Sequence, residues 1–81
     1  MASTEIVICI YNMYMVLMVT PLDAKSMRFK VISNDKGIDD MILNYKPNDT
    51  WTAEKVHMKF FTKKYICELG KLIKIKKPEW F

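Results

Sequence analysis

The sequence predicts a small α+β domain with an amphipathic helix at about residues 50–63 and antiparallel strands that include a C-terminal hairpin. Three observations lead to this fold class. The length of 81 residues suits one domain. Hydrophobic residues make up 51% and charged residues 27%, which is too apolar for a disordered chain. Segments with strand periodicity and helix periodicity both occur. We therefore expect residues 1–81 to form a single globular domain.

Residues 4–20 leave two interpretations open. Their first part is β-branched, which favours a strand, and their second part is rich in Met and Leu, which favours a helix. Apolar residues fall on every face, so periodicity does not decide. A buried strand or strand pair is one interpretation, and a helix capped by Ser3 and stopped before Pro21 is the other. As a helix, residues 6–19 would cover roughly 21 Å of a bilayer core about 30 Å thick, so we expect no transmembrane segment.

Residues 27–33 show the alternation of a half-buried strand. Arg28 and Lys30 face one way, and Phe29 and Val31 face the other. Side chains on the second face are therefore expected in the core.

The next two segments are predicted to be helical. Residues 38–45 place apolar side chains at positions i, i+3, i+4 and i+7, and the pattern ends at Pro47. Residues 50–63 follow the capping residues Asp49 and Thr50 and form one broad apolar arc opposite a row of lysines. This arc is the strongest periodic signal in the chain.

Residues 65–76 are predicted to form the C-terminal hairpin. Gly70 and Lys71 would make a two-residue type II′ turn between two apolar runs. A competing interpretation extends the preceding helix to Leu69, with Gly70 just beyond its C-terminal cap.

No constellation of catalytic or metal-ligating residues is found in the sequence. Cys9 and Cys67 lie in apolar runs and are expected to be buried thiols. His57 is the only histidine, and it falls on the apolar arc as a core residue. No Cys-x-x-Cys pair and no glycine-rich phosphate loop occurs. We expect no enzymatic activity, no metal and no cofactor.

Positive charge is concentrated in the last third of the chain. Residues 1–50 carry five basic and six acidic residues, whereas residues 51–81 carry eight lysines and three glutamates. Lys55, Lys59 and Lys63 are spaced i, i+4, i+8, and each such like-charge pair costs about 0.2–0.5 kcal/mol. An anionic partner would relieve this repulsion. The predicted partner-binding residues are Lys55, Lys59, Lys63, Lys64, Lys74, Lys76, Trp80 and Phe81.

A winged-helix order is the runner-up architecture. If residues 4–19 are helical, the order of elements resembles that of a winged-helix domain, with residues 50–63 as the recognition helix and Gly70-Lys71 as the wing tip. That helix would present lysine and threonine, without Arg, Asn or Gln for bidentate base contacts. The resemblance therefore implies contact with the nucleic-acid backbone rather than with base edges.

The function expected from these features is non-enzymatic binding through the lysine-rich face to nucleic acid or an acidic protein surface. The bias toward Lys, Ile and Met is typical of an AT-rich genome, so a phage or viral regulatory factor in the host cytoplasm fits the composition. The alternative is a protein-interaction module that inhibits or modulates a larger host protein through aromatic and Met-rich contacts, since the chain has seven methionines. A homodimer is left open.

Overall fold

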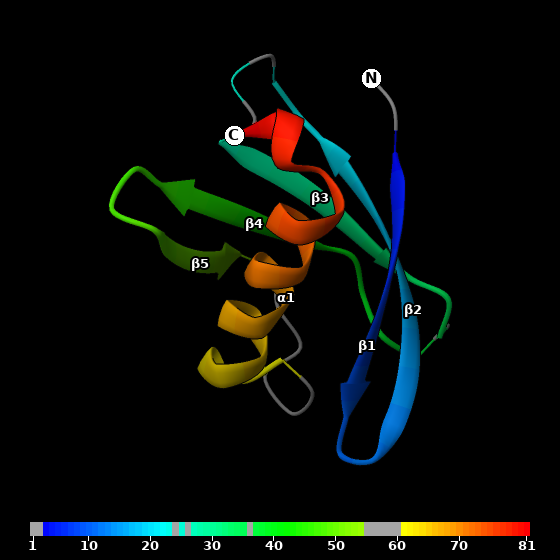
Figure 1. The fold of residues 1–81 in the computed structure, drawn as a ribbon. Coiled ribbons are helices and arrows are strands. Elements are labelled where there is room, and N and C mark those ends of the chain that lie inside the picture. The colour runs from blue at the N-terminus through cyan, green and yellow to red at the C-terminus, as the bar shows by residue number, and fades with distance from the viewer. Residues whose placement is uncertain (1–2, 24, 26, 36, 55–60) are drawn as a thin grey trace.

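Five antiparallel strands and one C-terminal helix make up the described part of the chain (Figure 1). The structure is a computed structural model, and it describes residues 3–23, 25, 27–35, 37–54 and 61–81. Each strand pairs with the next along the chain. The α+β class is confirmed. The elements are β1 (Thr4–Ile10), β2 (Met13–Pro21), β3 (Arg28–Ser33), β4 (Met41–Lys46), β5 (Thr50–Glu54), α1 (Lys63–Lys76) and the short 3₁₀ helix η1 (Pro78–Trp80).

Residues 4–20 form a strand pair, which confirms the first of the two interpretations. β1 and β2 join through Tyr11 and Asn12, whose φ angles of 51° and 62° fit a type I′ turn. Such turns usually contain glycine, and its absence hides the turn in the sequence. The winged-helix order required a helix over residues 4–19, and β1 and β2 occupy that segment.

One face of the sheet carries the hydrophobic core. Side chains alternate along each strand, and those on the inner face lie beneath α1, which crosses the curled sheet and contacts both β1 and β5 (Figure 1). The prediction for β3 is confirmed, because Phe29 and Val31 are buried while Arg28 is exposed. The other main core residues are Ile6, Ile8, Ile10, Met15, Leu17, Val19, Met41, Leu43, Trp51, Ile66, Leu69 and Ile73.

The helix predicted at residues 38–45 is wrong, because residues 41–46 form β4. Met41 and Leu43 are buried on the inner face, and Ile42 lies half-buried between them on the outer face. The apolar spacing of this short window fits both a period of 2 and a period of 3.6, and pairing with β3 selects the strand.

The helix predicted at residues 50–63 is also wrong over its first part. Residues 50–54 form β5, and α1 begins only at Lys63. Thr50, Trp51 and Thr52 have high strand propensity, and Trp51 turns inward while both threonines are exposed. Residues 55–60, including His57, lie outside the described residues.

The C-terminal hairpin predicted at residues 65–76 is wrong, because α1 runs through the whole segment. Its buried face consists of Ile66, Leu69, Gly70 and Ile73, which follow helical spacing. Gly70 lies within the helix rather than at a turn or a helix end. A Cβ atom on Gly70 would overlap the indole ring of Trp51, so glycine is what allows α1 to approach β5 this closely.

Candidate binding surfaces

The outer face of the sheet has an apolar half over β1, β2 and the end of β3. The register places Met18 between Glu5 and Ile32, Val7 opposite Val16, and Cys9 opposite Tyr14. Several of these side chains are far from buried: Tyr14 is 80% exposed, Val7 53%, Ile32 40% and Met18 39%. We call this surface the apolar outer patch, and it consists of Val7, Cys9, Tyr14, Val16, Met18 and Ile32.

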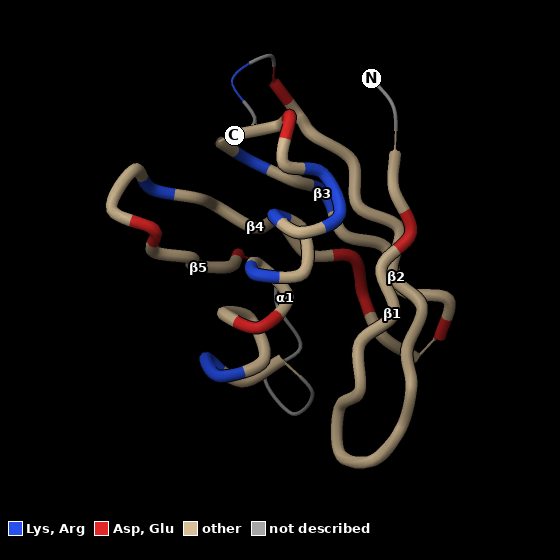
Figure 2. The backbone as a smooth tube through the Cα atoms, in the orientation of Figure 1, with Lys and Arg blue, Asp and Glu red and all other residues tan. Residues whose placement is uncertain are grey.

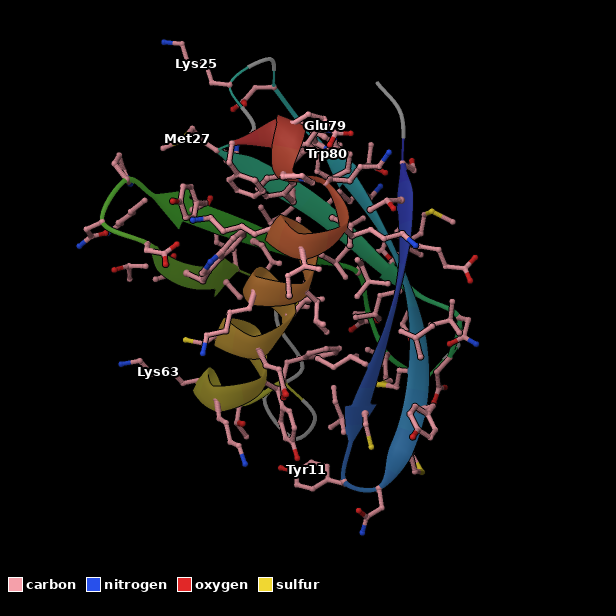
Figure 3. The ribbon with its side chains drawn as sticks, in the orientation of Figure 1. Tyr11, Lys25, Met27, Lys63, Glu79 and Trp80 are labelled. Atoms are coloured by element: carbon pink, nitrogen blue, oxygen red, sulfur yellow. The ribbon has the colours of Figure 1, made fainter. Side chains whose placement is uncertain are left out.

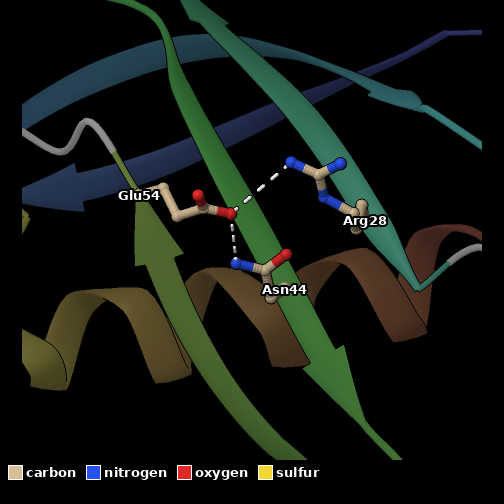
Figure 4. A network of polar contacts seen from close by, with 3 residues as sticks. All are labelled: Arg28, Asn44 and Glu54. Atoms are coloured by element: carbon tan, nitrogen blue, oxygen red, sulfur yellow. Dashed lines mark hydrogen bonds and ion pairs between the residues drawn. The ribbon is translucent and has the colours of Figure 1, made fainter.

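The other half of the outer face is polar. Arg28, Asn44 and Glu54 come from three neighbouring strands and meet there (Figure 4). The Asn44 Nδ2 atom donates a hydrogen bond of 2.9 Å to Glu54 Oε2. Arg28 Nη2 lies 3.5 Å from the same oxygen. Opposite charges and amides across strands are typical of a solvated sheet surface.

A shallow hollow lies within the apolar outer patch. Its volume is about 280 Å³, and it is open to solvent. Glu5, Ser33 and Asn34 form its polar rim, and Val16, Met18 and Ile32 form its apolar wall. The patch is therefore slightly concave rather than flat, with one carboxylate at its border.

The two cysteines do not occupy the buried positions predicted for them. Cys9 is exposed on the outer face, because strand alternation buries its neighbours Ile8 and Ile10 instead. Cys67 is half-buried on α1, and both thiols are free. Among the described residues, no cluster of three or more His, Cys, Asp or Glu side chains has the arrangement of a metal site.

Lysines gather on the solvent side of α1 (Figure 2). Lys63, Lys64, Lys71 and Lys76 are exposed, and none of the ion pairs in the described part of the chain involves them. Figure 3 shows Lys63 extending away from the start of the helix. Lys55 and Lys59, the first two members of the predicted row, lie outside the described residues.

Lys74 is engaged within the molecule. Its Nζ atom lies 2.6 Å from Asp49 Oδ1, 4.8 Å from the centre of the Tyr45 ring and 5.4 Å from that of Phe81. The hydrogen bond with Asp49 raises the pKa of Lys74 and lowers the pKa of the Asp49 carboxyl. Lys74 therefore connects α1 to the β4–β5 turn instead of presenting a free cation.

The C-terminal aromatic residues pack onto the inner side of the sheet. Phe29 stacks with Trp80 at a ring separation of 5.8 Å and lies 5.7 Å from Phe81. Trp51 lies 5.9 Å from Phe81 and is buried. Figure 3 shows Trp80 turned toward the molecule beside β3. These predicted contact residues thus have a role in packing, although Phe81 stays 43% exposed.

The predicted site residues do not form one surface. The exposed lysines follow α1, the aromatic tail belongs to the inner cluster, and the apolar outer patch lies on the opposite side of the sheet. The sequence analysis missed this patch, because the turn at Tyr11 and Asn12 sets which residues of 4–20 face outward. No helix in the described residues is both long and apolar enough to span a membrane. Comparisons of the chain with protein-family models, curated proteins and solved structures give no match.

Proposed function

We propose that this protein is a non-enzymatic interaction module that docks on an apolar surface of another protein through the apolar outer patch. The observation that carries the proposal is the exposure of Val7, Tyr14, Met18 and Ile32 side by side on one sheet face. A contiguous apolar surface on a small domain costs free energy in water, and such surfaces mark interaction sites.

The composition of the apolar outer patch also fits binding to a protein. Tyr14 offers a large, rigid ring with a polar tip, and Met18 offers a flexible thioether that adapts to irregular surfaces. Glu5 borders the hollow and is the acidic group at its rim. Apolar centres with a polar rim are the usual anatomy of protein interfaces.

Site-specific photo-crosslinking in the native cell tests this proposal. We would place a photo-reactive amino acid at Met18 in the apolar outer patch, and as a matched control at Thr52 in the polar half of the same face. The proposal expects a discrete adduct with one partner from position 18 and a much weaker one from position 52. Equal adducts from both positions, or none from position 18, would contradict it.

A second candidate function is binding of the α1 lysines to an acidic partner, either nucleic acid or protein. The observation that favours it is the group Lys63, Lys64 and Lys71 on the solvent side of α1, where Glu68 is the sole acidic residue of the helix. Like charges on one helix face repel one another, and an anionic partner relieves this repulsion.

Salt dependence tests the second candidate. If the partner is nucleic acid, the affinity falls with salt by a slope near −0.9 for each phosphate contact. Replacing Lys63, Lys64 and Lys71 by Gln would flatten that slope by up to about three contacts with little effect on folding. An unchanged slope and affinity would show that these lysines only solvate the helix.

A further inference from the structure

We propose that the unpaired edge of β1 pairs in antiparallel fashion with β1 of a second copy of this chain. The two five-stranded sheets would then join into one continuous sheet. This inference concerns the edge of the sheet and does not depend on the proposed function of its outer face.

β1 lacks the devices that usually protect an edge strand. It lies at the end of the strand order and is seven residues long. Its sequence, Thr-Glu-Ile-Val-Ile-Cys-Ile, holds one charge and neither proline, lysine nor glycine. Natural sheets blunt exposed edges with such residues, with bulges or with short strands, because a bare edge is a template for another strand.

The phase of the ladder shows which backbone groups remain free. Asn34 N–H donates to the carbonyl oxygen of Val16 at 3.1 Å, so alternate residues of β2 from Val16 onward direct their backbone groups toward β3. The residues between them bond to β1, and they lie opposite Thr4, Ile6, Ile8 and Ile10. The two-residue turn closing on Ile10 and Met13 gives the same phase.

The N–H and C=O groups that point to the open edge therefore belong to Glu5, Val7 and Cys9. In the described part of the chain, no backbone hydrogen bond outside the strands uses any of them. These three residues are symmetric about Val7, which is also the midpoint of β1. The edge is thus complementary to itself under a two-fold rotation.

A two-fold axis at Val7 gives a complete register. Val7 pairs with Val7 of the second copy, and Glu5 pairs with Cys9 of the second copy. All seven residues of β1 then find a partner. The two Glu5 side chains would lie at opposite ends of the junction, about 14 Å apart at 3.4 Å per residue, whereas a parallel alignment would place them side by side. Charge therefore favours the antiparallel arrangement.

The flank of α1 leaves this edge open. A groove of about 480 Å³ runs between β1 and the C-terminal half of α1, and Glu5, Ile6, Val7, Leu72, Ile75 and Lys76 line it. Ile75 is 77% exposed at this border, which is unusual for an aliphatic side chain next to a core. A strand added to β1 would cover Ile75 and the exposed side of Val7. The contact is smaller than a standard interface, so we expect micromolar affinity.

Analytical ultracentrifugation over micromolar to millimolar concentrations tests the proposal. The parent chain should convert from monomer to dimer. Val7→Pro removes an N–H that points to the open edge and none that bonds β2, so dimerisation should weaken at least ten-fold while circular dichroism still shows the fold. Val7→Thr is the matched control, because it keeps the backbone donor and strand propensity, and it should dimerise within about three-fold of the parent.

Hydrogen exchange keeps the test decisive if Val7→Pro fails to fold. In the parent chain, the amides of Glu5, Val7 and Cys9 should become protected as concentration rises, while those of Ile6 and Ile8 are protected throughout. A chain that stays monomeric to millimolar concentration, with fast exchange at Val7, would overturn the proposal, whether or not a foreign peptide binds the edge. Met18→Lys should leave dimerisation unchanged, so this result and the crosslinking result are separable.

Discussion

The two halves of the outer sheet face have opposite chemistry above a shared core. Over β3, β4 and β5, the Arg28, Asn44 and Glu54 side chains contact one another and suit water. Over β1 and β2, Val7, Tyr14 and Met18 face outward without such groups. Because the inner side chains beneath both halves are buried in the same way, the apolar outer patch is not needed to form the core. The difference teaches that folding explains the inner face, whereas binding explains the apolar half of the outer face.

The largest expected effect separates the inner face from the outer face on a single strand. Phe29 is fully buried and contacts Trp51, Trp80 and Phe81, so Phe29→Ala should lower the free energy of unfolding by about 3–5 kcal/mol. Ile32→Ala, on the outer side of the same strand, should cost less than about 1 kcal/mol. Urea denaturation of both variants measures the contrast, and equal losses would break the comparison.

The next effect concerns the approach of α1 to β5. Gly70→Ala should destabilise the protein by about 1–3 kcal/mol, because the added methyl overlaps the buried Trp51 ring and outweighs the gain in helix propensity. Gly37→Ala is the control, since its Cβ would meet only Asp35 in an exposed loop, and it should change stability by less than about 0.5 kcal/mol. A more stable Gly70→Ala variant would contradict the packing of α1 against β5.

A smaller effect is expected in the polar half of the outer face. Glu54→Gln removes the charge that faces Arg28 but keeps an oxygen that can accept from Asn44. Exposed ion pairs contribute about 0.2–1 kcal/mol, so the thermal midpoint should fall only slightly. A loss of several kcal/mol would mean that this half is part of the stabilising framework rather than a solvated surface.

The smallest effect is the pH dependence of the contact between Lys74 and Asp49. The lowered pKa of Asp49 means that its contribution is present above its unfolded value of 3.8 and is lost as pH falls through the lower folded pKa. The raised pKa of Lys74 means that its contribution is present below 10.5 and is lost as pH rises through the higher folded pKa. Thermal melts of Asp49→Asn should show a weaker acid and alkaline dependence than the parent, and parallel profiles would contradict the pairing.

Local pattern predicts part of this fold from the sequence. Alternation in residues 27–33 identifies β3, because one face of that strand is charged and the other apolar. Residues 4–20 show strand propensity but no turn signal, since Tyr11 and Asn12 adopt the turn without glycine. The contact of Tyr11 with Tyr65, at a ring separation of 5.4 Å, supports that turn from a distant part of the chain.

Long-range contacts determine what local pattern misses. Gly70 suggests a turn, yet it is needed for the contact with Trp51, nineteen positions earlier in the sequence. The spacing of Ile66, Leu69 and Ile73 was the available signal for α1, and it conflicts with a hairpin. In the same way, charge alone marks Lys74 as a partner-binding residue, whereas its contact with Asp49 depends on the β4–β5 turn.

The central claim is that the apolar outer patch contributes to binding and not to folding. Met18→Thr combined with Ile32→Thr tests it most directly, because both residues face outward opposite each other and threonine keeps strand propensity. The measurement is the free energy of unfolding together with the yield of the partner adduct from a photo-reactive group at Tyr14. We predict stability within about 1 kcal/mol of the parent and an adduct yield at least ten-fold lower. A loss of several kcal/mol, or an undiminished adduct, would contradict the claim.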